Sequence, residues 1–144
     1  MAGLTENRVL GLDYGSKTVG VAVTDALGLT AVSLETIKRE KENHLRSTYR
    51  RIAELIDEYG VELAVVGLPL NMDGSEGERA KLARQFAEEL ARRTGVDIVM
   101  QDERLTTAEA EELLAMTGKR RGNTKDRIDA VEAAIILTDY LNQN

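Results

Sequence analysis

Asp13 stands at the place in this chain where metal or catalytic chemistry is easiest to expect. It lies between two valine-rich apolar runs, residues 9–12 and 19–23, with Gly15 and Gly20 nearby. Short valine-rich runs joined by a glycine-containing link predict a β-hairpin, with Asp13 at the end of its first strand. An ionised carboxylate beside a core is costly unless it is paired or holds a metal. The alternative is that Asp13 only starts the turn, as Asp often does.

Two further pairs of acids occur later in the chain. Asp102 and Glu103 follow the last predicted strand, and Asp126 and Asp129, at positions i and i+3, share a face of the last predicted helix. The alternatives are that the first pair caps the next helix or pairs with Arg104, and that Asp126 and Asp129 complement a helix dipole. Asp129 fits this alternative less well, because apolar residues surround it on the helix. Since ligands bind beyond the carboxyl ends of parallel strands, these acids and Asp13 could meet at one edge.

Three carboxylates at one edge favour a site for Mg²⁺ or Mn²⁺, because the chain has no cysteine and one histidine. Such ions activate water and stabilise the leaving oxygen in phosphodiester hydrolysis. The dinucleotide fingerprint is excluded, because Gly11, Asp13 and Gly15 precede a predicted strand rather than a helix. A serine–histidine–aspartate triad is equally unfavoured, and we expect His44 to be solvated or to cap a helix.

The elements that must position these acids follow from the apolar pattern. It predicts strands over residues 9–12, 18–24, 30–37, 61–68 and 96–100, and helices over residues 43–59, about 75–94, 107–116 and 125–141. Hairpins first, then strands alternating with helices, predict an α/β three-layer sandwich with a mixed five-stranded sheet. We expect one domain over residues 1–144, with the third strand at an edge. Ser75 and Glu78 form a capping-box pattern for the second helix, and we interpret Asn71 and Asp73 as turn residues.

Composition limits how the chain could bind nucleic acid. A net charge of −6, no Trp and one Phe argue against a broad basic surface or an aromatic stacking platform. Binding would then depend on a local basic patch, formed by Lys17, Arg104, Lys119, Arg120, Arg121, Lys125 and Arg127. We interpret these residues as phosphate contacts, with a solubilising loop as the alternative. With neither a signal-peptide pattern nor an apolar run of membrane length, we expect a cytoplasmic protein with no membrane partner.

The same residues carry a resemblance to a known family. Four motifs follow one another along the chain: Asp13-Tyr14-Gly15 with Gly20-Val21-Ala22, Gly67-Leu68-Pro69 through Asp73-Gly74, Asp102-Glu103-Arg104-Leu105-Thr106-Thr107, and Ile128-Asp129 before Ala133-Ala134-Ile135-Ile136-Leu137. In these motifs, and over almost its whole length, the chain resembles the YqgF family, also called RuvX. The resemblance implies a ribonuclease-H-like fold, with Asp13, Glu103 and Asp129 binding metal and Asp126 as an optional further ligand. In other nucleases of this fold an acid commonly follows the fourth strand, where this chain has Gly67-Leu68-Pro69, so the resemblance implies a site assembled differently.

The family is described both as nucleases that mature the 5′ end of pre-16S ribosomal RNA and as Holliday junction resolvases. The resemblance therefore implies a hydrolase, an endonuclease dependent on Mg²⁺ or Mn²⁺ that acts on structured RNA, most of all a ribosomal RNA precursor. A DNA junction resolvase is the first alternative; it normally requires a symmetric dimer, whereas we expect a monomer or weak homodimer. A non-catalytic nucleic-acid-binding module with a degenerate site is the second. An actin-like ATP-binding domain is not expected, because 144 residues leave no room for its second lobe.

Overall fold

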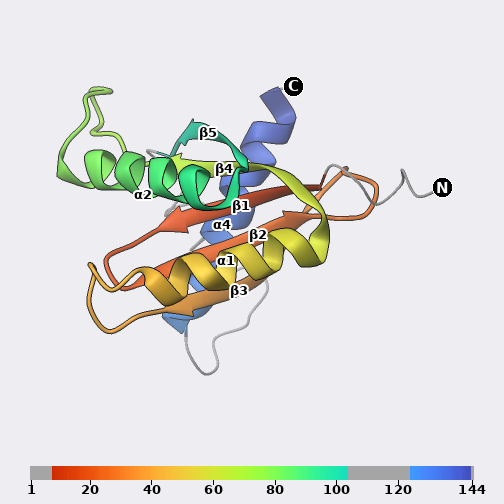
Figure 1. The fold of residues 1–144 in the computed structure, drawn as a ribbon. Helices are drawn as coiled ribbons and strands as arrows, with labels where there is room; N and C mark the ends of the chain where they lie inside the picture. Colours follow the sequence, from red (N-terminus) through yellow and green to blue (C-terminus); the bar gives the residue numbers. More distant parts are fainter. Residues whose placement is uncertain (1–7, 104–123, 144) are drawn as a thin grey trace.

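A five-stranded mixed sheet organises the computed structural model, which describes residues 8–103 and 124–143 (Figure 1). Its strands are β1 (Arg8–Tyr14), β2 (Thr18–Thr24), β3 (Ala31–Lys38), β4 (Val61–Leu68) and β5 (Asp97–Asp102), in the order β3-β2-β1-β4-β5. The helices are α1 (Arg46–Tyr59), α2 (Glu78–Thr94) and α4 (Thr124–Gln143). The predicted mixed sheet, with the third strand at an edge, is confirmed. The helix predicted over residues 107–116 lies outside the described residues.

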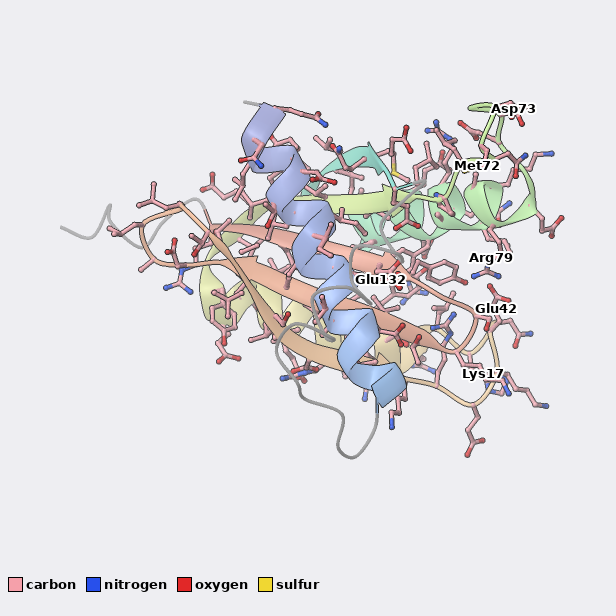
Figure 2. The ribbon with its side chains drawn as sticks, turned by 180° about the vertical axis from the view of Figure 1, so that it is seen from behind. Lys17, Glu42, Met72, Asp73, Arg79 and Glu132 are labelled. Carbon is pink, nitrogen blue, oxygen red and sulfur yellow. The ribbon has the colours of Figure 1, made fainter. Side chains whose placement is uncertain are left out.

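The helices make the sheet the middle of three layers. α1 and α2 cover one face, and α4 crosses the other, as Figures 1 and 2 show from opposite sides. Between α1, α2 and the sheet lies a core that includes Tyr49, Ile52, Phe86, Leu90 and Leu12. Beneath α4 lies a smaller core, formed by Ala22, Val65, Ala133, Ile136 and Leu137. Two apolar cores, one on each face, therefore hold the sheet in place.

Strand direction brings the ends of β1 and β5 to the same edge. β1 runs antiparallel to β2, whereas β4 runs parallel to both β1 and β5. The expectation that the first and last strands share a direction is therefore confirmed. β4 lies between them and is buried on both faces, with Val66 in one core and Val65 in the other.

Asp13 lies inside β1 rather than at its turn. The strand extends to Tyr14, two residues beyond its predicted end, and Asp13 pairs with Gly20 of β2. The turn comes later and is closed by the Gly15 N–H, which donates to the Thr18 carbonyl at 2.7 Å. The alternative that Asp13 merely starts the turn is therefore wrong.

The capping box predicted for the second helix is also wrong. α2 begins at Glu78 with Gly77 as its N-cap, and no side chain caps it. The Ser75 hydroxyl donates instead to the Asp73 carboxylate at 2.6 Å, and the Asn71 side-chain amide donates to the Ser75 hydroxyl at 2.9 Å. Ser75 is therefore committed to the turn before the helix. The prediction that Asn71 and Asp73 build this turn is confirmed.

Candidate active site

The alternation of side chains along β1 directs Asp13 toward α4. Leu10, Leu12 and Tyr14 belong to the core under α1 and α2. Successive side chains of a strand point to opposite faces, so Gly11 and Asp13 face the other way. Gly11 confirms this direction, because a Cβ atom added there would lie 2.8 Å from the Ala133 carbonyl oxygen of α4. The Asp13 carboxyl therefore lies between the end of β1 and the helix.

Glu103 reaches the site from the residue after β5. Its main-chain N–H donates to the Leu68 carbonyl of β4 at 3.2 Å, which continues the pairing of the two strands by one residue. Its side chain lies over Gly67, where an added Cβ atom would be 2.8 Å from Glu103 Cδ. The carboxyl of Glu103 thus occupies the space above the β4 residue that carries no acid in this chain. The residue after β5 therefore places a carboxyl beside the end of β4.

Asp129 is brought in by a close approach of α4 to β2. A Cβ atom added at Gly20 would collide with the main-chain carbonyl of Asp129 and lie 3.1 Å from the Ala130 nitrogen. Because Gly20 pairs with Asp13 across the hairpin, this approach sets Asp129 beside Asp13. The three acids predicted from the sequence therefore come together, from β1, from the end of β5 and from α4.

A fourth acid, Glu132, belongs to the same group and was not predicted. It lies on α4 over the end of β1 (Figure 2), and its carboxyl forms a hydrogen bond with that of Asp13. The available signal was its spacing, because Glu132 follows Asp129 by three residues and so shares its helix face. Apolar residues surround it in the sequence, and this spacing alone does not single it out.

Two acids of this group, Asp13 and Glu103, have raised pKa values, because they are partly buried and lie close to other acids. The pKa of Asp13 is raised well above its ordinary value, first by burial, then by the charge of Glu103 and by its hydrogen bond to Glu132. Burial and the charge of Glu132 raise the pKa of Glu103 to about 7, although a hydrogen bond to Asp13 opposes the shift. The acids therefore disfavour one another's ionised forms, a condition that bound cations relieve.

The residues present fit a hard divalent cation in their chemistry. All the candidate ligands are carboxylates, which suit Mg²⁺ or Mn²⁺. Oε1 of Glu103 is buried and accepts no hydrogen bond from the residues that the structure describes, so one ligand atom is available in the site. In the described segments, however, no three acidic or histidine side chains are already arranged around a common point that could hold an ion. Asp13 instead hydrogen-bonds to Glu103 and Glu132, so a bound cation would displace the protons that these carboxyls share.

The predicted basic patch is described only in part. Lys17 is exposed in the turn after β1, beyond the same end of the strands as the acids (Figure 2). Outside the described residues lie Arg104, Lys119, Arg120 and Arg121, together with the side chains of Lys125, Asp126 and Arg127. Phosphate contact by these groups, and metal binding by Asp126, stay predictions.

A polar cluster not predicted from the sequence lies beyond the end of β1. The Tyr14 hydroxyl donates to the Glu42 carboxylate at 3.1 Å, and Arg79 of α2 pairs with the same carboxylate at 2.9 Å. Arg39 is buried and donates to the Gly15 carbonyl at 2.6 Å. These contacts brace the turn that follows Asp13, so they position the site rather than line it.

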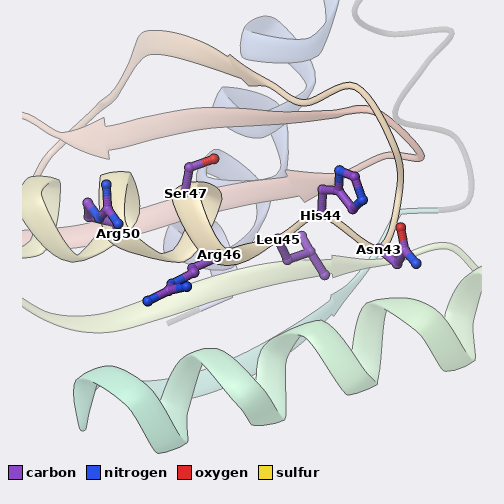
Figure 3. Close-up of a pocket in the computed structure, with 6 residues that line it drawn as sticks. All are labelled: Asn43, His44, Leu45, Arg46, Ser47 and Arg50. Carbon is purple, nitrogen blue, oxygen red and sulfur yellow. The ribbon is translucent and has the colours of Figure 1, made fainter.

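An open hollow of about 410 Å³ lies at the start of α1 and is unrelated to the acids (Figure 3). Its lining consists of Asn43, His44, Leu45, Arg46, Ser47 and Arg50. α1 covers the face of the sheet opposite α4, so the hollow is separate from the acidic site. His44 is exposed there, which confirms that it is solvated.

The arrangement defines a class of protein. A sheet ordered β3-β2-β1-β4-β5, with acids on β1 and on a helix crossing its far face, is that of the ribonuclease-H-like fold. The same fold occurs in RuvC of Thermus thermophilus, alone (TM-score 0.59, 19% identity, 94% of this chain and 95% of that one) and in complex with a Holliday junction substrate (TM-score 0.58, 17% identity, 96% and 95%).

Among the described helices none is long and apolar enough to cross a membrane.

Within this class the chain belongs to the RuvX family, described as Holliday junction resolvase, which it matches over residues 7–143. A protein of Lachnospira eligens is 53% identical over 134 residues, which is 93% of this chain and 96% of that protein. Proteins of Agathobacter rectalis and Lactococcus lactis are each 48% identical over 135 residues, 94% of either chain. All three carry the name "Putative pre-16S rRNA nuclease". The family expected from the sequence is confirmed.

Proposed function

We propose that this chain is a divalent-metal-dependent endonuclease that processes the 5′ end of pre-16S ribosomal RNA. The observation that supports the chemistry is the meeting of Asp13, Glu103 and Asp129 at one end of the sheet, from three separate segments of the chain. The names of its relatives support the substrate, because they describe nucleases of pre-16S rRNA. Since ribosomes mature in the cytoplasm, the proposal implies a cytoplasmic protein.

Different residues of the chain would bind the metal and the substrate. Asp13, Glu103 and Asp129 would hold Mg²⁺ or Mn²⁺, which when bound supplies stabilisation of the charge that develops on a phosphodiester during hydrolysis. Asp13 and Glu103 are partly exposed, so a polymer can reach the site without an enclosing pocket. Lys17 projects from the adjacent turn, where its ammonium group would contact a phosphate of the bound strand.

A DNA junction resolvase is the second candidate. The family description and the fold shared with RuvC favour it. Paired cleavage of a four-way junction normally requires a symmetric dimer, whereas we propose a monomer or weak homodimer. The two candidates share the acidic site and differ in the polymer that lies across it, so a substrate comparison separates them.

The experiment compares cleavage of a labelled precursor rRNA fragment and a four-way DNA junction in Mn²⁺, in Mg²⁺ and in EDTA. Wild type is compared with Asp13→Asn and with Glu58→Gln, a control that removes an exposed acid from α1 on the opposite face. We expect RNA cleavage that requires metal and falls roughly 100-fold or more in Asp13→Asn, because even the outer partners of a metal typically contribute 10- to 100-fold to affinity or activity. Glu58→Gln should match wild type.

Other outcomes are equally decisive. Metal-dependent cleavage of the junction alone would favour the resolvase. Full activity in Asp13→Asn, with its fold confirmed by circular dichroism, would refute the assignment of the site. No cleavage of either substrate by the wild-type protein would favour a non-catalytic nucleic-acid-binding module.

A further inference from the structure

Glu132 belongs to the acidic group but is not one of the metal ligands predicted from the sequence. It lies on α4 three residues after Asp129, so the two side chains share the helix face that crosses the sheet. Its carboxyl forms a hydrogen bond with that of Asp13, which comes from β1. Glu132 therefore connects the helix to the acid around which the site is built.

The position of Glu132 makes it a neighbour of a second acid. Glu103 lies against the same helix, because a Cβ atom added at Gly67 would meet both the Glu103 side chain and Ile136 Cδ1 of α4, 2.6 Å away. In agreement with this placement, the charge of Glu132 raises the pKa of Glu103. Glu132 consequently faces both Asp13 and Glu103, whereas Asp129 lies at the step where α4 approaches Gly20. Four carboxyl groups thus converge where the predicted site has three.

A purely structural role does not explain this placement. In the segments that the structure describes, no basic side chain forms an ion pair with Glu132, although such pairs occur elsewhere, as between Arg79 and Glu42. A fourth acid beside three partly buried ones adds repulsion and desolvation cost to the metal-free protein. The same charge becomes favourable once a cation binds among the carboxylates.

We propose that Glu132 is a positioning residue that holds the Asp13 carboxyl in the site and strengthens the binding of a divalent cation there. This inference rests on the proposed metal-dependent function and adds a residue to it. Glu132 stabilises the metal-bound state and destabilises the metal-free state. A residue that serves the fold alone would stabilise both.

The variant that separates these effects is Glu132→Gln. The amide keeps the size of the side chain and can donate a hydrogen bond to Asp13, but it carries no charge. We expect the Kd for Mn²⁺ to rise roughly 10- to 100-fold, the range typical of groups that orient metal ligands. In EDTA the variant should melt at the same temperature as wild type or a higher one. Glu132→Asp keeps the charge on a shorter stem and should bind Mn²⁺ more tightly than Glu132→Gln.

The test measures Mn²⁺ binding by titration calorimetry and by the electron paramagnetic resonance signal of free Mn²⁺, with thermal unfolding in EDTA alongside. Glu58→Gln serves as the control for loss of one glutamate charge. Equal Mn²⁺ affinity in wild type and Glu132→Gln would overturn the role of Glu132 and leave the metal site intact. A lower melting temperature of Glu132→Gln in EDTA would overturn it too, because the residue would then serve the fold. Absence of saturable Mn²⁺ binding by wild type would overturn the metal site itself, and the role of Glu132 with it.

Discussion

Raising the pH should destabilise the metal-free protein through Glu103. Burial and the charge of Glu132 raise the pKa of this carboxyl from 4.5 to about 7. The folded state then holds a proton that the unfolded state releases. The stabilisation from this group is complete below the unfolded pKa and is lost as the pH rises through the folded one. The pKa of Asp13 is raised as well, so its contribution has the same sign.

The magnitude follows from the size of the shift. The pKa of Glu103 rises from 4.5 to about 7, and each pKa unit corresponds to about 1.4 kcal/mol. Below the unfolded pKa, the proton that Glu103 holds therefore contributes about 3 kcal/mol to the free energy of unfolding. Most of this stabilisation should disappear between about pH 5 and about pH 8. Glu103→Gln remains neutral at every pH, so its stability should fall less over the same range, by a difference of about 3 kcal/mol.

The assay is urea unfolding in EDTA, monitored by circular dichroism at several pH values across this range. The quantity compared is the pH-dependent change in the free energy of unfolding, for wild type, Glu103→Gln and the exposed control Glu58→Gln. Wild type and the control should lose stability in parallel, and Glu103→Gln should lose less. Parallel pH profiles for wild type and Glu103→Gln would refute the reasoning, because Glu103 would then bind its proton no more tightly in the folded state.

The glycines beneath the acids give two further predictions. Gly67→Ala should abolish cleavage, because the new methyl group would meet the Glu103 side chain, as well as Ile136 Cδ1 of α4 at 2.6 Å, and the carboxyl would have to leave its place; circular dichroism checks that the protein stays folded, and retained cleavage would show that the carboxyl is needed elsewhere. Gly20→Ala should lower the free energy of unfolding by about 1–3 kcal/mol in urea titrations, because it presses on the main chain of Asp129, which yields less readily than a side chain; unchanged stability would contradict the close approach. Gly77→Ala, whose Cβ would meet Asn71 atoms at 3.6 Å and no other described residue within 4 Å, is the control for the cleavage assay.

The sheet could be predicted because its strands are short and regular. Alternation and valine-rich runs indicate them from local sequence, and the strand directions follow from which connections contain helices. Strand ends were less predictable. β1 continues to Tyr14, whose ring packs against Phe86 at a centroid distance of 4.7 Å, and this tertiary contact carries no local signal.

The start of α2 shows how local rules compete. Ser75 and Glu78 have the spacing of a capping box, but the Ser75 hydroxyl already donates to Asp73 in the preceding turn. Ser, Asn and Asp serve both helix caps and turns, so the pattern alone does not decide between them. In this chain the Ser75 hydroxyl is bound within the turn. The helix therefore starts at Glu78, and its N-cap residue is Gly77, which has no side chain to cap it.

The acids could be located on elements from the sequence, but their meeting depends on residues that have no side chain. A glycine inside a strand suggests a bulge or the close approach of another segment, but it does not say which segment approaches. Gly20 lies inside β2 and Gly67 inside β4, and each leaves the space that an incoming acid occupies, the main chain of Asp129 in one case and the side chain of Glu103 in the other. If Glu103 binds metal as we propose, a carboxylate missing from β4 does not make the site degenerate, because Gly67 leaves room for the carboxylate that follows β5.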